Sequence, residues 1–158
     1  MSEVEQEQDD PVIQWVTFRL GEENYGIKVM QVQEVLRIPE IAPVPGAAID
    51  IIGIINLRGN VVTVVDMRNR FGLMPKVPDD DSRIVIIESD GQVIGILVDS
   101  VAEVVDLKDT EVEATPNAGN DEKAKYIQGV SSKNGGLLIL VDLNKFFVED
   151  KPAEMDMF

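Results

Sequence analysis

An internal repeat is the feature that most constrains what this chain can fold into. Residues 16–35 resemble residues 85–104 without a gap, and Gly26 of the first block falls on Gly95 of the second. A repeat of this kind means that each copy carries the same order of apolar runs and turns. We therefore expect a duplicated fold rather than one irregular domain, although two unrelated β-rich halves would also look somewhat alike.

A second block supports the duplication, because it repeats at an offset of 76 residues with the same residue types in the same order. Its matched pairs are Gly53 with Gly129, Gly59 with Gly135, Val65-Asp66 with Val141-Asp142, and Phe71 with Phe147. The second copy has extra residues in a polar stretch, 106–125, which contains loop signals. The copies span about 12–75 and 82–148, and we expect each to form one half-domain.

The pattern inside each copy predicts an all-β fold. Short runs rich in Val, Ile and Leu end at Gly, Asn or Asp, as strands bounded by tight turns do. Five such runs per copy, with Val61–Val65 and Leu137–Val141 almost wholly apolar, favour strands buried on both faces in small closed barrels. The predicted hairpin turns are Gly21–Asn24, Asn56–Gly59, Ser89–Gln92 and Ser132–Gly136, in which Gly59 and Gly135 are turn residues.

Helix is predicted to be scarce. Residues 29–36 could place several apolar side chains on one face of a short helix or turn before Pro39. Asp66 and Asp142 can cap the amides of short helices at 67–71 and 143–147. Paired aspartates in a duplicated β protein also suggest an aspartic-type hydrolase, but the residues that follow lack the small side chain and glycine that such a site needs. We expect two helix caps.

Composition excludes several classes of function. The formal net charge of −15 disfavours nucleic acid as a partner. The absence of Cys and His removes the commonest nucleophile, general base and transition-metal ligands. Asp79-Asp80-Asp81 lacks the ligand spacing of a calcium loop, so we expect no metal and no cofactor. A non-catalytic binding module remains.

The two ends of the chain are acidic and poor in apolar residues. Residues 1–11 and 149–158 cannot bury much surface, and we expect a disordered N-terminus and a C-terminal tail. Neither a secretory signal nor a run of about 20 apolar residues is present, so we expect a cytoplasmic protein without direct membrane insertion.

Several separated motifs, in this order, resemble one family. They are Val16–Ile27 around Tyr25-Gly26-Ile27, then Val32-Gln33-Glu34-Val35, Ile52–Gly59 with Asn56-Leu57-Arg58-Gly59, Val65–Arg68, and in the second copy Val93–Asp99 and Leu138–Asp142. On these residues the chain resembles the CheW family of bacterial chemotaxis coupling proteins. The resemblance implies a single domain over 12–148, made of two SH3-like five-stranded β-barrels.

The resemblance also implies a function. Proteins of this family act as adaptors that couple the cytoplasmic signalling tips of chemoreceptors to the regulatory domain of the histidine kinase CheA, in membrane-associated receptor arrays. A receptor helix end is taken up in the groove between the barrels, and the kinase's regulatory domain packs barrel to barrel. A regulatory domain cut from such a kinase would show the same fold and remains an alternative.

By correspondence with the family's motifs, six residues are implied in receptor binding. They are Arg58, Glu34, Val32, Asn56, Gly53 and Val61. The guanidinium of Arg58 lies in a predicted hairpin between apolar runs, where its stem can pack and its donors can point outward. The alternatives are that Asn56 and Gly59 only shape a turn, that Val32 and Val61 are core, and that Glu34 holds Arg58 internally. The kinase-binding residues cannot be named from the sequence.

Overall fold

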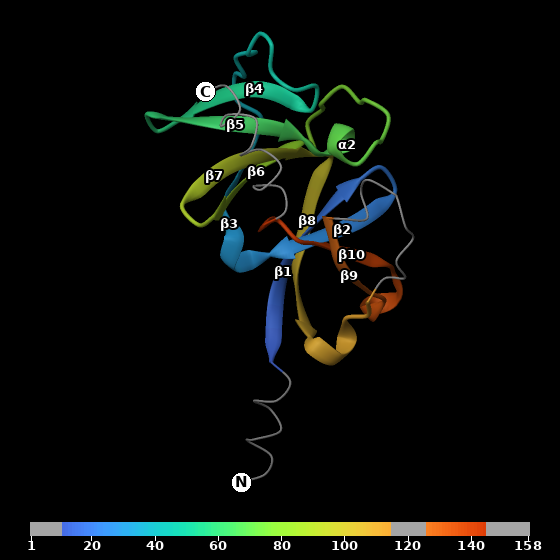
Figure 1. Cartoon of the computed structure of the whole chain (residues 1–158). Helices are drawn as coiled ribbons and strands as arrows, with labels where there is room; N and C mark the ends of the chain where they lie inside the picture. The colour runs from blue at the N-terminus through green and yellow to red at the C-terminus, as the bar shows by residue number, and fades with distance from the viewer. Residues whose placement is uncertain (1–10, 115–125, 145–158) are drawn as a thin grey trace.

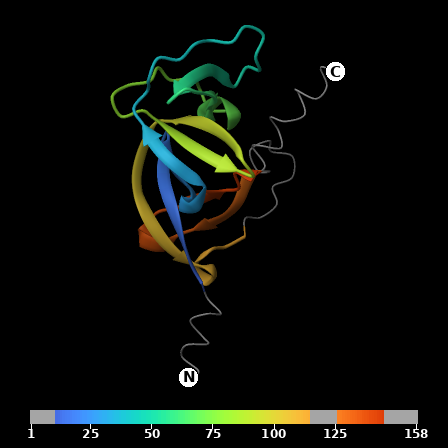
Figure 2. The same cartoon turned by 90° about the vertical axis from the view of Figure 1, so that its left-hand side faces the viewer.

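The computed structural model describes residues 11–114 and 126–144 and consists of two five-stranded, curved β-sheets. Sheet A contains β1 (Val12–Leu20), β2 (Glu23–Lys28), β8 (Ser100–Lys108), β9 (Ile127–Ser131) and β10 (Leu138–Val141), in the order β8-β1-β2-β10-β9. Sheet B contains β3 (Val32–Leu36), β4 (Ile51–Leu57), β5 (Asn60–Asp66), β6 (Arg83–Ser89) and β7 (Gln92–Val98), in the order β3-β6-β7-β5-β4. Figure 1 shows sheet B above sheet A, and Figure 2 shows the same stack from the side.

The all-β prediction is confirmed, with five strands from each sequence copy. The helical elements are short: η1 (Val29–Gln31), α2 (Met67–Arg70), η2 (Asp109–Glu111) and η4 (Lys133–Gly135). The four predicted hairpin turns lie between paired strands, at β1–β2, β4–β5, β6–β7 and β9–β10. At β4–β5 the central residues Arg58 and Gly59 both have positive φ, 51° and 88°. A two-residue turn of this kind matches the twist of the flanking strands.

The expectation of one half-domain per copy is wrong. Sheet A combines β1 and β2 of the first copy with β8, β9 and β10 of the second, and sheet B combines β3, β4 and β5 with β6 and β7. The joins are two parallel pairs, β2 with β10 and β5 with β7. Because the hairpins β1–β2 and β6–β7 are equivalent, either one offers the same edge to either copy. The local sequence fixes each hairpin but not the sheet that it completes.

Two local predictions also need correction. Residues 32–36 form strand β3 rather than part of a helix, and only η1 before it is a helical turn. The polar stretch assigned to a loop begins as strand, since β8 continues to Lys108 and Leu107 is buried. Tertiary pairing with β1 overrides the polar composition here, because alternate β8 side chains face the interior.

Both aspartate caps are confirmed in their first turn. Asp66 Oδ1 accepts a hydrogen bond from the amide of Arg68 at 3.0 Å, and Asp142 Oδ1 accepts one from the amide of Asn144 at 3.1 Å. The remainder of the second predicted helix, residues 145–147, lies outside the described residues, as do residues 1–10 and the tail 149–158.

The buried apolar residues form three clusters. The largest lies between the sheets and includes Phe18, Tyr25 and Ile27 from sheet A with Met67 and Ile87 from the side of sheet B. A second fills the interior of sheet B, and a third fills the interior of sheet A around Trp15. The two sheets therefore form one folded unit with a shared core, and the predicted surface residues are held at its edges.

Candidate functional site

The ion pair between Arg58 and Glu34 is the centre of the candidate site. Arg58 sits at the tip of the β4–β5 hairpin, and Glu34 lies in β3, at the opposite edge of sheet B. Nη2 of Arg58 donates to Oε2 of Glu34, and Nη1 donates to Oε1 at 3.3 Å. This hydrogen bond holds the pKa of the Glu34 carboxyl below its usual range. The structure therefore shows the internal pairing of Arg58 with Glu34 that the sequence left open as an alternative.

The pair nevertheless remains at the surface. The side chain of Arg58 is 69% exposed and that of Glu34 is 26% exposed. An exposed ion pair contributes little to stability, because both partners are well solvated when apart. A guanidinium has five donors, so several of those on Arg58 are left for carboxylates or carbonyls of a partner. The geometry allows Arg58 to be paired internally and still contact another protein.

Asn56 and Val61 lie together beside this pair. They face each other across the β4–β5 hairpin, and both line a surface hollow whose other walls include Pro39, Ala42 and Ile54. Oδ1 of Asn56 accepts a hydrogen bond from the amide of Gly59 at 2.8 Å, so the turn-shaping role of Asn56 and Gly59 is confirmed. Val61 is 70% exposed, and the alternative that it belongs to the core is wrong. Its neighbour Val62 is the buried one.

Gly53 and Val32 lie apart from the hairpin tip. Gly53 is buried in β4, and a Cβ there would collide with the carbonyl oxygen of Ala42 and approach its carbonyl carbon to 2.9 Å. Val32 is half-buried and packs against the core between the sheets. For these two positions the structure gives a packing reason for the residue type.

A polar groove lies at the junction of the two sheets, where the resemblance implied a groove between the barrels, but its lining residues were not identified from the sequence. This junction groove is lined by Lys28, Met30, Gln31, Glu88, Ser89 and Asn144, among others, which come from both sheets. Met30 in η1 is 86% exposed at its edge. A methionine two positions before Val32 carries no signal of exposure in a sequence, because only the strand exchange brings these segments together.

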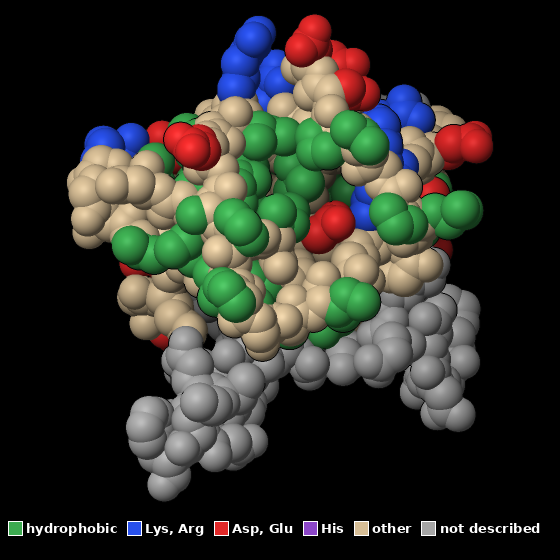
Figure 3. Space-filling view, turned by 90° about the horizontal axis from the view of Figure 1, so that it is seen from above, with side chains coloured by type: hydrophobic (Ala, Val, Ile, Leu, Met, Phe, Trp, Pro, Cys, Tyr) green, Lys and Arg blue, Asp and Glu red, His purple; other side chains and the backbone are tan. Residues whose placement is uncertain are grey.

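An apolar surface lies on the outer face of sheet B and its loops, and this too was missed. The exposed large hydrophobic residues of these loops are Val44 and Ile49, before β4, and Met74 and Val77, between α2 and β6, with Ile49 the most exposed at 89%. Figure 3 shows hydrophobic side chains gathered in the middle of the face seen from above. Surface patches of this kind mark protein–protein contacts more often than single exposed side chains do.

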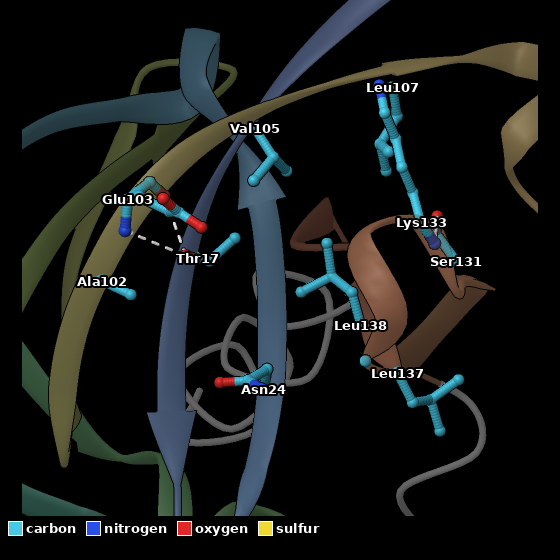
Figure 4. A pocket seen from close by; sticks show the side chains of 11 residues that line it. Thr17, Asn24, Ala102, Glu103, Val105, Leu107, Ser131, Lys133, Leu137 and Leu138 are labelled. Atoms are coloured by element: carbon cyan, nitrogen blue, oxygen red, sulfur yellow. Dashed lines mark hydrogen bonds between the residues drawn. The ribbon is translucent and has the colours of Figure 1, made fainter.

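A further hollow of about 180 Å³ opens on sheet A, between β8 and the η4–β10 segment (Figure 4). Its walls include Val105, Leu107 and Leu138, and two of its polar side chains bond the backbone of β8. The hydroxyl of Thr17 donates to the carbonyl of Glu103 at 2.8 Å, and Nζ of Lys133 donates to the carbonyl of Asp106 at 2.9 Å. These contacts hold the strand edge and supply no reactive group.

Within the described residues, no group of three or more acidic, histidine or cysteine side chains is placed to hold a metal ion. None of the helices in this part of the chain has the length and apolar character needed to cross a bilayer. What the described surface offers is an exposed ion pair, an apolar face and a groove, all on two sheets that share one core. Surfaces of this kind are typical of a protein-binding module.

The chain belongs to the CheW family: the model described as the CheW-like domain matches residues 14–151. It is 32% identical over 143 residues to a chemotaxis protein CheW of Treponema pallidum, covering 88% of this chain and 84% of that protein. It is 29% identical to the CheW of Rhizobium meliloti, over 86% of this chain and 88% of that protein. It is thus a non-catalytic chemotaxis adaptor.

A solved structure supports the same assignment. The scaffolding protein TtCheW from Thermoanaerobacter tengcongensis has a TM-score of 0.77 and 34% sequence identity, and the match covers 83% of this chain and 89% of that one. The two-barrel β fold expected from the resemblance is therefore confirmed.

Proposed function

We propose that this adaptor couples the cytoplasmic signalling tips of chemoreceptors to the regulatory domain of the histidine kinase CheA, and that it does so in membrane-associated receptor arrays. The observation that carries the proposal is the exposed Arg58–Glu34 pair, with Asn56 and Val61 beside it. An adaptor that joins two partners needs two surfaces, and the described residues offer two of different character.

The receptor surface comprises the pair and its neighbours on β4 and β5, and it extends along β3 to Val32 and the junction groove. The receptor tip supplies carboxylates or carbonyls to the free donors of Arg58, and apolar side chains to Val61. Arginine is favoured at such contacts because its planar donors bind two acceptors at once. Gly53 supports this surface by allowing β4 to approach Ala42 closely.

The kinase surface is the apolar face around Ile49 and Val44. An exposed apolar face of one β-barrel matches a similar face on another, which suits a regulatory domain of the same fold. Ile49→Asp should therefore weaken kinase binding while receptor binding remains. Loss of both partners in a folded Ile49→Asp protein would show that the two surfaces are not separate.

A charge-swap pulldown tests the receptor surface. Receptor-tip fragments and CheA are mixed with wild-type protein, Arg58→Glu, Glu34→Arg and the double exchange Arg58→Glu with Glu34→Arg, and circular dichroism confirms the fold of each. If Arg58 contacts the receptor, the double exchange restores the internal pair but not receptor binding. If Arg58 matters only through Glu34, the double exchange restores binding.

Lys108→Glu is the matched control, because it makes the same charge change at an exposed position of sheet A. It should leave both interactions intact. Wild-type protein that binds neither partner would refute the proposed coupling role.

A further inference from the structure

The chain passes twice between the two sheets, once through η1 and once through Asp99. η1 joins β2 of sheet A to β3 of sheet B, and Asp99 is the single residue between β7 of sheet B and β8 of sheet A. The offset of the sequence repeat makes these two crossovers equivalent, since Met30 in η1 corresponds to Asp99. The shared core lies between them.

An ion pair secures the Asp99 crossover. Nε and Nη2 of Arg68, in α2, each donate to one carboxylate oxygen of Asp99 at 2.8 Å. The same carboxylate accepts a hydrogen bond from the amide of Gly21 at 2.8 Å, and the amide of Asp99 donates to the carbonyl of Arg19 at 3.0 Å. The carboxylate thus ties the β1–β2 turn of sheet A to the helix that follows β5 of sheet B.

This ionic latch, Arg68 with Asp99 and Gly21, is largely shielded from water. The side chains of Arg68 and Asp99 are 16% and 13% exposed. Nη1 of Arg68 also donates to the carbonyl of Met74 at 2.6 Å, which fixes the segment after α2 to the same point. Bidentate charged hydrogen bonds are roughly twice as strong as neutral ones, and partial burial reduces their screening.

The equivalent position at the other crossover carries a neutral contact. Asn144 follows its capping aspartate by two residues, as Arg68 does, and its Oδ1 accepts hydrogen bonds from Oγ of Ser89 at 2.5 Å and Nε2 of Gln31 at 3.3 Å. Ser89 borders the β6–β7 turn, the counterpart of the β1–β2 turn. This neutral latch, Asn144 with Gln31 and Ser89, lies in the wall of the junction groove.

In Figure 1 the two latches lie at opposite ends of the sheet junction. α2 stands above the tip of the β1–β2 hairpin on the right, whereas the blue helical turn of η1 and the red end of the described chain lie on the left. In the ionic latch, the carboxylate of Asp99 accepts two hydrogen bonds from Arg68 and one from the amide of Gly21, and both side chains are shielded from water. The neutral latch has two hydrogen bonds to one exposed amide oxygen.

We infer that the two sheets hinge about the Arg68–Asp99 end of their junction, so that the junction groove at the Asn144 end is the part that opens and closes. The shared apolar core limits this motion to a small rotation, because sliding would expose it to water. Duplication supplied two equivalent crossovers, and the exchange of arginine for asparagine at one of them makes the junction asymmetric. The inference concerns motion within this chain and holds whichever partner the groove receives.

Spin-label distances across each end of the junction test the hinge. The sequence contains no cysteine, so introduced pairs are labelled uniquely. One pair, Glu22→Cys with Met74→Cys, spans the ionic latch, and the other, Gln128→Cys with Gln92→Cys, spans the neutral latch. The flexibility of the label widens every distribution, so each variant is compared with the same pair in the otherwise wild-type protein.

Removing each latch should have unequal effects. Asp99→Asn should broaden the Glu22–Met74 distribution, because it removes the ionic contact while keeping the shape of the side chain. Asn144→Ala should leave the Gln128–Gln92 distribution nearly unchanged, because that end already moves. Lys133→Gln removes an ion pair between η4 and η2, both attached to strands of sheet A, and should change neither distance.

Two results would overturn the hinge. One is an Asn144→Ala variant that broadens the Gln128–Gln92 distance distribution as much as Asp99→Asn broadens the Glu22–Met74 distribution. The second is a folded Asp99→Asn variant whose Glu22–Met74 distribution stays at the wild-type width. If Asp99→Asn fails to fold, Arg68→Lys replaces it, since lysine keeps the charge but loses the two-donor fork, and the same two results decide.

Discussion

Replacing Gly53 with alanine tests whether close packing or partner contact explains this glycine. The added Cβ would collide with the carbonyl oxygen of Ala42. That oxygen accepts a hydrogen bond from the amide of Ile54 at 2.8 Å, and the amide of Ala42 donates to the carbonyl of Ile54 at 2.9 Å. The backbone of residue 42 must therefore move away, and both hydrogen bonds are strained or lost.

The size of the effect can be estimated from these contacts. Forcing an extra carbon into a packed site costs about 1–3 kcal/mol. Loss of the two backbone hydrogen bonds adds about 1 kcal/mol each. Alanine also reduces the conformational freedom of the unfolded chain, which offsets about 0.4–1 kcal/mol of this loss. The expected net loss is about 2–5 kcal/mol. At about 3 °C per kcal/mol for a chain of this size, the melting temperature should fall by roughly 6–15 °C.

Thermal and urea unfolding followed by circular dichroism would measure this loss. Gly136→Ala is the matched control, because no atom lies within 4 Å of its Cβ position and its φ of −118° suits any residue. Gly129→Ala should behave like Gly53→Ala, since its Cβ would lie 2.9 Å from the carbonyl oxygen of Glu113 in the equivalent place. A Gly53→Ala protein as stable as wild type would refute the packing argument, and loss of receptor binding in that stable protein would point to contact instead.

Three further outcomes are expected. The Arg68 guanidinium holds the pKa of Asp99 below its usual range. The stability that this carboxylate supplies is therefore present above the unfolded pKa of about 3.9 and is lost as pH falls through the lower folded value. Acid unfolding of Asp99→Asn should show a shallower pH dependence below about pH 4, and an unchanged slope would contradict this account. Asp66→Ala removes the cap of α2 and should cost about 1 kcal/mol in urea unfolding, whereas no change would mean that water replaces the carboxylate. Gly59→Ala places a side chain at a φ of 88° and should cost about 1–2 kcal/mol, and a neutral result would show that the turn can change type.

The parts of the fold that could be predicted are those fixed within a few residues. Asn56-Leu57-Arg58-Gly59 predicts a hairpin because its positive φ angles and the amide contact of Asn56 are local. Asp66 predicts a helix start because its carboxylate reaches an amide two residues later. In each case the residues that determine the structure are neighbours in the chain.

The candidate site could be predicted only in part. Arg58 and Glu34 were both identified, yet their pairing depends on β3 and the β4–β5 hairpin meeting at the surface. Val61 and Val62 are identical side chains at adjacent positions, and only the facing of β5 exposes the first and buries the second. The sequence did not indicate that Ile49 and Met30 are exposed, because the exposure of an apolar side chain depends on which other segments cover it.

The sequence by itself determined most strands, the hairpin turns and the caps, because these follow from short-range dihedral preferences and hydrogen bonds, and it showed the duplication directly. Only the tertiary structure decided that the copies exchange hairpins and that Arg68 and Asn144 hold equivalent crossovers unequally. The physical reason is that equivalent hairpins present the same backbone edge to either copy. The choice between them is made by the shared core, which exists only after distant strands have come together.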